Sequence, residues 1–160
     1  MIRDAREADR DAIAALQTAS WRDVYAGALP PAFLRDGLAA GMAEKWRGRA
    51  FGPPLLVLVE EAGDGALAGF VCCLTDRDPP YVDNLHVDPG LRSRGTGSRL
   101  MGACFARLRG LGHDACALTV WDRNARARAF YARLGGTEGA ARPADLMGHP
   151  VREVPVAFRL

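Results

Sequence analysis

One stretch near the middle of the chain constrains the fold more than any other. Residues 85–87 (Leu-His-Val) end an apolar strand, an Asp-Pro-Gly turn follows, and the Gly-rich loop 92–97 leads into an apolar-periodic segment that reaches Arg109. A strand, a tight loop and a helix in direct succession are typical of a sheet covered by helices. Two glycines at 110 and 112 then end the helix.

The composition of this loop favours an anionic ligand. Gly95 and Gly97 let the backbone approach a ligand closely. The first N–H groups of the following helix have no acceptor inside the helix, and the helix dipole attracts negative charge, so a pyrophosphate fits. Arg92 and Arg94 can pair with phosphate oxygens. The spacing matches neither a P-loop nor a dinucleotide fingerprint, and a tight turn without any ligand explains two glycines equally well.

The remaining pattern predicts a mixed α/β (α+β) fold in one domain over residues 1–160. Its centre is antiparallel, and strand-helix-strand crossovers follow. Asp9 is expected to cap a first helix with Ala12, Ile13, Leu16 and Ala19 on one face. Residues 63–65 form a hairpin turn, and 140–150 form a loop before the last strand. Strands are expected at 2–5, 55–60, 66–75, 81–87, 115–120 and 151–160, and further helices at 31–38, 41–49, 97–109 and 124–134.

Bulk properties exclude several classes of protein. The 160 residues carry 21 Lys+Arg against 19 Asp+Glu, a balance that argues against nucleic-acid binding. No apolar run approaches the length of a membrane span, and no signal peptide is recognisable, so we expect a cytoplasmic protein without membrane attachment. Three scattered histidines predict no metal site. The four cysteines have apolar neighbours and are expected to be reduced core residues: Cys72, Cys73, Cys104 and Cys116.

Two motifs in the correct order resemble those of the GNAT superfamily of N-acetyltransferases. The first is R-x-x-G-x-G after a strand that ends in hydrophobic-x-Val-x-Pro. The second, N-x-x-A-x-x-F-Y-x-x-x-G, follows the strand at 115–120. The resemblance covers nearly the whole chain and rests on Arg92, Gly95, Gly97, Asn124, Ala127, Phe130, Tyr131 and Gly135.

The resemblance implies a GNAT-like twisted sheet of six to seven strands with about four helices. A V-shaped opening between strands 81–87 and 115–120 is expected to admit acetyl-CoA, the acyl donor. The resemblance places the pyrophosphate on the loop, the pantetheine arm along the first of these strands and on an asparagine, and the thioester sulfur near a tyrosine. The cofactor-binding residues are then Leu85, His86, Val87, Arg92, Ser93, Arg94, Gly95, Thr96, Gly97, Ser98, Asn124 and Tyr131.

Direct attack of a primary amine on the thioester needs a neutral amine, a polarised carbonyl and a protonated leaving sulfur. The resemblance assigns the last role to Tyr131 as general acid. The family often has a glutamate base on strand 81–87, where this chain has Tyr81 and Asp83. The base is therefore Asp83, His86 or water. Strand alternation predicts that Asp83 shares a face with Tyr81, opposite Asn84 and His86.

The acceptor amine is not readable from the sequence. A small molecule and a peptide both remain open, as does a homodimer. Aromatic and acidic residues are candidates for contacting the acceptor: Trp21, Tyr25, Tyr81 and Asp83. A non-catalytic coenzyme A-binding sensor or partner domain is the alternative, although such a binder would not require a hydroxyl at the sulfur.

Overall fold

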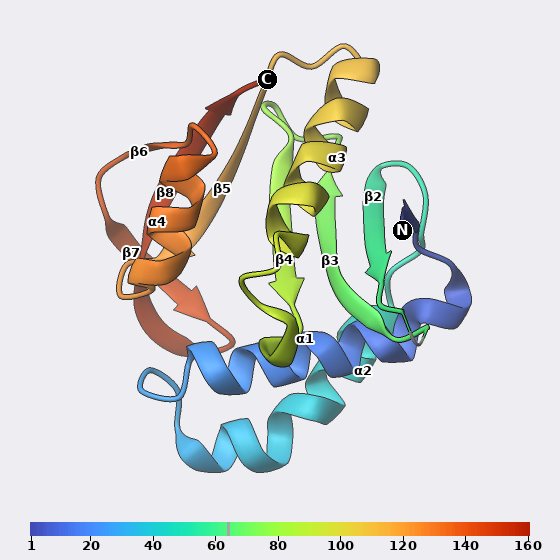
Figure 1. Cartoon of the computed structure of the whole chain (residues 1–160). Coiled ribbons are helices and arrows are strands. Elements are labelled where there is room, and N and C mark those ends of the chain that lie inside the picture. Colours follow the sequence, from blue (N-terminus) through green and yellow to red (C-terminus); the bar gives the residue numbers. More distant parts are fainter. Residues whose placement is uncertain (64) are drawn as a thin grey trace.

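The apolar strands form one mixed sheet in the computed structural model, which describes residues 1–63 and 65–160 (Figure 1). Its order is β1-β2-β3-β4-β5-β8-β6, and β7 also pairs with β8. Asp64, the centre of the expected hairpin turn, lies outside the described residues. The strands are β1 (Ile2–Asp4), β2 (Leu55–Glu61), β3 (Leu67–Leu74), β4 (Tyr81–Val87), β5 (Ala115–Trp121), β6 (Thr137–Glu138), β7 (Arg142–Leu146) and β8 (His149–Arg159).

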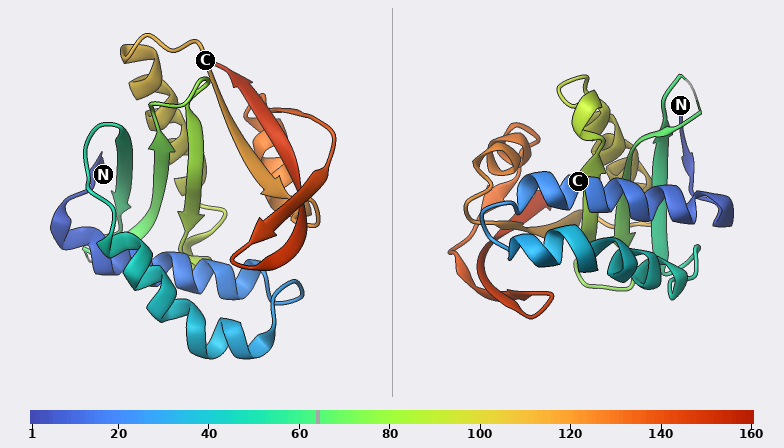
Figure 2. Two further views of the ribbon diagram at one scale, coloured as in Figure 1. Left: turned by 180° about the vertical axis from the view of Figure 1, so that it is seen from behind. Right: turned by 90° about the horizontal axis from the view of Figure 1, so that it is seen from below.

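Helices cover both faces of this sheet (Figure 2). One core lies between α1, α2 and the sheet, and the second lies under α3 and α4. Neighbouring Cys72 and Cys73 point into different cores, as strand alternation predicts, and all four cysteines are free and buried. The helical segments are η1 (Glu7–Asp9), α1 (Arg10–Val24), the π-helical turn η2 (Phe33–Gly37), α2 (Leu38–Arg47), η3 (Pro89–Leu91), α3 (Thr96–Gly110) and α4 (Ala125–Arg133).

The buried face of α1 differs from the predicted one. Ile13 and Leu16 are buried as expected, but Ala12 and Ala19 are exposed, and Gln17 takes a core position. Positions three and four residues from Ile13 share its face, whereas Ala12 is rotated by about 100° from it. The sequence prediction followed apolar residues alone and so missed a buried polar one.

Asp9 does not cap α1 with its side chain, contrary to the sequence prediction. Its carboxylate instead accepts hydrogen bonds from the Arg6 backbone N–H at 2.6 Å and from Arg3 Nη1 and Nη2 at 2.7 and 2.9 Å. The hydrogen bonds from Arg3 and Arg6 hold the pKa of Asp9 below its usual value. This carboxylate therefore ties β1 to the start of the helical layer.

The expected loop over 140–150 is wrong, because these residues form most of a hairpin. β7 and β8 pair from Arg142↔Glu153 to Leu146↔His149. Met147 and Gly148 turn the chain with φ of 50° and 84°. Positive φ at both turn positions suits the right-handed twist of a hairpin, but methionine is an unusual residue there. With β6 and β7, the described residues make eight strands rather than six or seven.

The V-shaped opening is confirmed between β4 and β5. These parallel strands pair only at Tyr81↔Ala117, and beyond that point they diverge (Figure 1). The register against β3 also shifts here, since Cys72 lies opposite Asn84 but Cys73 lies opposite Val82. Asp83 is thus the extra residue of a β-bulge. A bulge bends its strand and increases the local twist, which favours the separation of β4 from β5.

His86 packs between the sheet and α1. Its Nδ1 and Ser20 Oγ share a hydrogen bond of 2.9 Å, and its ring lies 5.5 Å from that of Phe70. Burial lowers the pKa of His86 to about 3, and the charges of Lys45 and Arg92 act in the same direction. The imidazole is therefore neutral in the folded protein at neutral pH.

We expect the free energy of unfolding to fall as the pH drops from about 6.5 to about 5. The unfolded chain then takes up a proton at His86, whose ordinary pKa is 6.5, whereas the folded chain does not do so until about pH 3. The loss approaches about 1.4 kcal/mol per pH unit. Urea denaturation at several pH values should show that His86→Asn removes this part of the pH dependence of the unfolding free energy. His113→Asn, in the loop after α3, should retain it. An unchanged slope in His86→Asn would mean that the folded protein binds this proton readily.

Candidate active site

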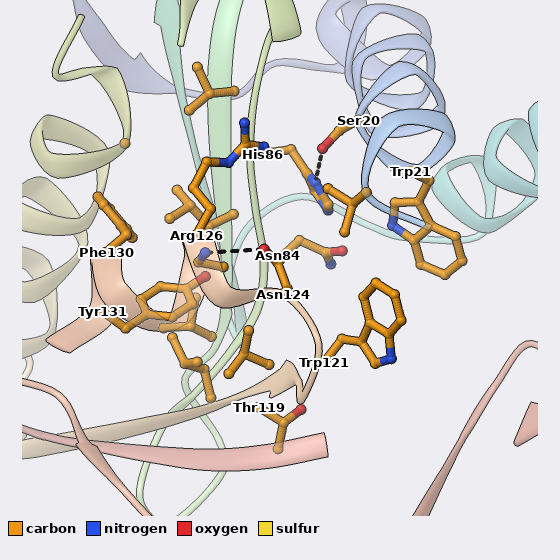
Figure 3. A pocket seen from close by; sticks show the side chains of 18 of the residues that line it. Ser20, Trp21, Asn84, His86, Thr119, Trp121, Asn124, Arg126, Phe130 and Tyr131 are labelled. Carbon is orange, nitrogen blue, oxygen red and sulfur yellow. Dashed lines mark hydrogen bonds between the residues drawn. The ribbon is translucent and has the colours of Figure 1, made fainter. Parts of the chain in front are cut away.

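A cavity of about 630 Å³ occupies the opening between β4 and β5 (Figure 3). Phe130 and Tyr131 lie on one side of it, and Trp21 and Trp121 lie on the other. Arg94 is the only predicted cofactor-binding residue outside its lining. The predicted site residues that line it are Trp21, Tyr25, Tyr81, Asp83, Leu85, His86, Val87, Arg92, Ser93, Gly95, Thr96, Gly97, Ser98, Asn124 and Tyr131.

The Gly-rich loop and the start of α3 line this cavity. Gly95 precedes α3 in the left-handed conformation, with φ of 80°, and Ser93 has φ of 64°. The N–H groups at the start of α3 have no acceptor within the helix. Gly97 has a packing role as well, because a Cβ there would lie 3.2 Å from the ring of Phe130. The loop thus combines a helix start whose free N–H groups could bind an anion with close contact between α3 and α4.

The two loop arginines differ in their surroundings, and their expected pairing with phosphate oxygens stays a prediction. Arg92 forms an ion pair with Asp23 on α1, and this hydrogen bond keeps the pKa of Asp23 below its usual value. Arg94 is exposed, and its carbonyl accepts a hydrogen bond of 2.9 Å from Arg99. Spacing along the loop could not reveal Asp23, which lies 69 residues earlier. Arg92 therefore links the loop to the opposite helical layer.

The second motif places two residues at the cavity from α4. Asn124 caps the helix, because its Oδ1 accepts a hydrogen bond of 3.1 Å from the Ala127 N–H. Tyr131 packs edge-on against Phe130 and Phe158, with ring centroids 5.2 and 6.2 Å away. Burial raises the pKa of Tyr131, so its hydroxyl stays protonated at neutral pH. It can donate a hydrogen bond to a negatively charged atom in the cavity.

Strand alternation predicted that Asp83 and Asn84 point to opposite faces of the sheet, and this prediction is wrong. Its Oδ2 accepts hydrogen bonds from Asn84 Nδ2 at 2.6 Å and from Arg49 Nη2 at 2.7 Å. The bulge breaks the two-residue period, so consecutive side chains meet on one side. The guanidinium of Arg49 also lies over the ring of Trp46, 5.1 Å from its centroid. Asp83 is consequently an ion-paired carboxylate at the edge of the cavity.

Buried hydrogen bonds extend from Asp83 into the helical layer. Asn84 Oδ1 accepts from Gln17 Nε2 at 2.7 Å, and Gln17 Oε1 accepts from Trp46 Nε1 at 2.7 Å. An indole N–H can only donate, so it fixes the orientation of both amides and directs the Asn84 NH₂ at Asp83. Together with Arg49, these residues close a ring that joins α1, α2 and β4. We call Gln17, Trp46, Arg49, Asp83 and Asn84 the bulge ring.

Aromatic residues line the α1 side of the cavity. The rings of Trp21 and Tyr25 are 4.9 Å apart, and those of Tyr25 and Trp121 are 5.5 Å apart. Burial raises the pKa of Tyr25 to about 12. The Tyr81 hydroxyl and Thr119 Oγ1 share a hydrogen bond of 2.7 Å across the opening. This end of the cavity suits an uncharged or apolar portion of a ligand.

Sequence reasoning missed several residues of the lining. They lie outside the two motifs and reach the cavity only through the tertiary fold: Ser20, Lys45, Thr119, Trp121 and Glu153. Within residues 1–63 and 65–160 no cluster of three or more His, Cys, Asp or Glu residues could hold a metal ion. Over the same residues, every helix is too short or too polar to cross a membrane.

Curated relatives resemble part of this chain. The mycothiol acetyltransferase of Beutenbergia cavernae is 39% identical over 103 residues, which are 64% of this chain and 33% of that protein. The mycothiol acetyltransferase of Clavibacter sepedonicus is 38% identical over 106 residues, covering 66% and 33%. The matched part of this chain therefore spans about a third of the length of these relatives.

Solved structures share the fold. The PaiA N-acetyltransferase of Thermoplasma acidophilum, in complex with coenzyme A, superposes with a TM-score of 0.74 at 17% identity and covers 100% of this chain and 98% of that one. The structure of yncA from Salmonella typhimurium with its cofactor acetyl-CoA gives 0.71 at 20% identity, covering 100% and 93%. The family model of the acetyltransferase (GNAT) family matches residues 14–136. With both motifs lining the cavity between β4 and β5, this chain belongs to the acetyltransferase (GNAT) family.

Proposed function

We propose that residues 1–160 act as one N-acetyltransferase domain that transfers the acetyl group of acetyl-CoA to a primary amine by direct attack. The observation that carries this proposal is the continuous cavity, which extends from the start of α3, past Tyr131, to the aromatic residues of α1. A donor can enter along the loop side and an acceptor along the α1 side. The names of the relatives, which are acetyltransferases, support the same reaction.

The proposed donor site uses mainly backbone groups. The free N–H groups at the start of α3 bind the pyrophosphate, supported by the helix dipole. The edge of β4 that faces the opening pairs only once with β5, which leaves backbone N–H and C=O groups of Leu85 and Val87 to bind the pantetheine arm. Acetyl-CoA supplies an activated thioester. A backbone N–H near Val87 polarises its carbonyl.

Tyr131 serves the leaving sulfur in this proposal. A thiol has an ordinary pKa of about 8.5, and burial raises the pKa of the Tyr131 phenol above its own ordinary value of 10.0. Full proton transfer from the phenol to the leaving thiolate is therefore energetically unfavourable. The hydroxyl acts best as a hydrogen-bond donor that strengthens as negative charge develops on sulfur.

Asp83 receives the proton of the attacking amine, directly or through water. Its Oδ2 is engaged by Arg49 and Asn84, whereas its Oδ1 accepts no hydrogen bond from the described part of the chain. The carboxylate lines the cavity, so Oδ1 is available to an ammonium group. His86 fits this role less well because its Nδ1 is bound to Ser20 and its pKa is low.

A coenzyme A release assay with acetyl-CoA and a panel of primary amines tests this function. We expect amine-dependent release of the thiol. A protein that binds acetyl-CoA but releases no coenzyme A with any amine would instead be the non-catalytic coenzyme A-binding domain.

Replacing Gly95 should weaken donor binding selectively. Gly95→Ala forces an alanine to φ of 80°, which costs about 1–2 kcal/mol and disturbs the donors of the loop. Gly112→Ala has the same strain, at φ of 89°, but lies beyond α3, outside the cavity lining. Calorimetry should show acetyl-CoA affinity reduced about tenfold or more in Gly95→Ala and unchanged in Gly112→Ala. Equal effects in both variants would exclude the loop as the binding site. Gly97 is a poorer test because it packs against Phe130.

Tyr131→Phe should reduce kcat by about 100-fold while the affinity for acetyl-CoA stays near that of the wild type. The variant keeps the ring packing against Phe130 and Phe158 and removes only the hydroxyl. Rapid-quench kinetics must establish that the chemical step limits turnover. If kcat is then unaltered, Tyr131 is a packing residue.

A further inference from the structure

Lys45 is a cation at the acceptor end of the cavity that the reaction proposed above does not use. It lies in the last turn of α2 and lines the cavity together with Tyr81 and Asp83. Its side chain is largely withdrawn from solvent, and the residue is half-buried. Its ammonium group makes no hydrogen bond or ion pair with any described residue.

The charges around Lys45 do not balance. Asp83 is the neighbouring carboxylate, and it already forms an ion pair of 2.7 Å with Arg49. His86 is neutral because burial lowers its pKa to about 3. Lys45 and Arg49 thus supply two positive charges against the single negative charge of Asp83. The local excess of one positive charge favours an anionic group in this part of the cavity.

Other acidic residues around the cavity have partners elsewhere. Glu153 on β8 pairs with Arg142 at 3.0 Å, and Asp23 pairs with Arg92 across the opening. Asp145 accepts a hydrogen bond of 2.8 Å from the Gly148 N–H within the turn of the β7–β8 hairpin. Among the residues that the structure describes, no carboxylate forms an ion pair with Lys45.

Burial without such a partner is unfavourable for an ammonium group. Desolvation lowers the pKa of Lys45, and the charge of Arg49 adds to this effect, although Asp83 opposes it. A ligand carboxylate in the cavity would compensate the ammonium group for its lost hydration through a charge-assisted hydrogen bond.

We propose that Lys45 binds the carboxylate of the acceptor, and that the acceptor is therefore an α-amino acid. This inference rests on the proposed acetyl transfer. An α-amino acid carries its ammonium and carboxylate on one carbon, so both can reach neighbouring groups of opposite charge: the carboxylate meets Lys45, and the amine meets the free Oδ1 of Asp83. Trp21, Tyr25 and Trp121 then contact the amino-acid side chain.

Matched acceptors test the carboxylate requirement. Coenzyme A release is measured with the twenty common L-amino acids and with the corresponding amino-acid amides. The amides lack the negative charge of the carboxylate. We expect the wild type to have a kcat/KM about 10- to 100-fold higher for the best acid than for its amide, mainly through KM. Equal use of acid and amide would overturn the proposal.

Variants assign the preference to Lys45. Lys45→Met should lose the preference by raising KM for the acid while leaving the amide unaffected, and Lys45→Arg should retain part of it. Arg47→Met removes an exposed charge from the same turn of α2 and should behave as the wild type. A preference that persists in Lys45→Met would contradict the assignment. If acid and amide lose activity equally, Lys45 has another role, such as proton transfer.

A binding measurement separates this inference from the proposed function. Calorimetry with coenzyme A-saturated protein compares the N-acetyl derivative of each amino acid with the N-acetyl amino-acid amide. We expect the best acid to bind the wild type about 10- to 100-fold more tightly than its amide, and Lys45→Met to abolish the difference. Such selectivity without amine-dependent turnover would refute the acetyl transfer but retain the carboxylate site. Turnover with amines but no preference for the acid over the amide would support the acetyl transfer and refute the carboxylate site.

Discussion

The ion pair between Asp83 and Arg49 is the contact on which the rest of the site depends. Asp83 is the extra residue of the bulge in β4, and Arg49 holds it from the segment after α2. The buried amides of Gln17 and Asn84 complete the bulge ring with Trp46. The ring therefore fixes α1 and α2 to the sheet where β4 begins to diverge from β5.

The two ends of the cavity are built on different principles. At the start of α3, backbone N–H groups and a left-handed glycine form the proposed donor site, and many sequences can satisfy these requirements. At the proposed acceptor end, individual side chains from α1, α2, β4 and β5 determine the shape and charge. This contrast explains why family motifs identify a donor while the acceptor must be inferred from contacts such as those around Lys45.

Local signals in the sequence predicted the parts of the fold that depend on local geometry. Gly95 and Asn124 lie at helix starts, and the strands that flank the opening are where the apolar pattern put them. The failures depend on long-range contacts or irregular backbone. Asp23 engages Arg92 from a distant helix, the bulge turns Asp83 toward Asn84, and Met147 adopts a turn conformation that its residue type does not suggest. Period-two alternation cannot report a bulge, because one extra residue reverses every later side chain.

A crystal structure of the protein with coenzyme A tests the central claim most directly, namely that the separation of β4 from β5 forms the donor site. The account predicts pyrophosphate oxygens within hydrogen-bonding distance of the N–H groups at the start of α3. It also predicts the pantetheine arm between β4 and β5 and the sulfur beside the Tyr131 hydroxyl. Coenzyme A bound elsewhere, with the space between these two strands filled by side chains, would contradict it.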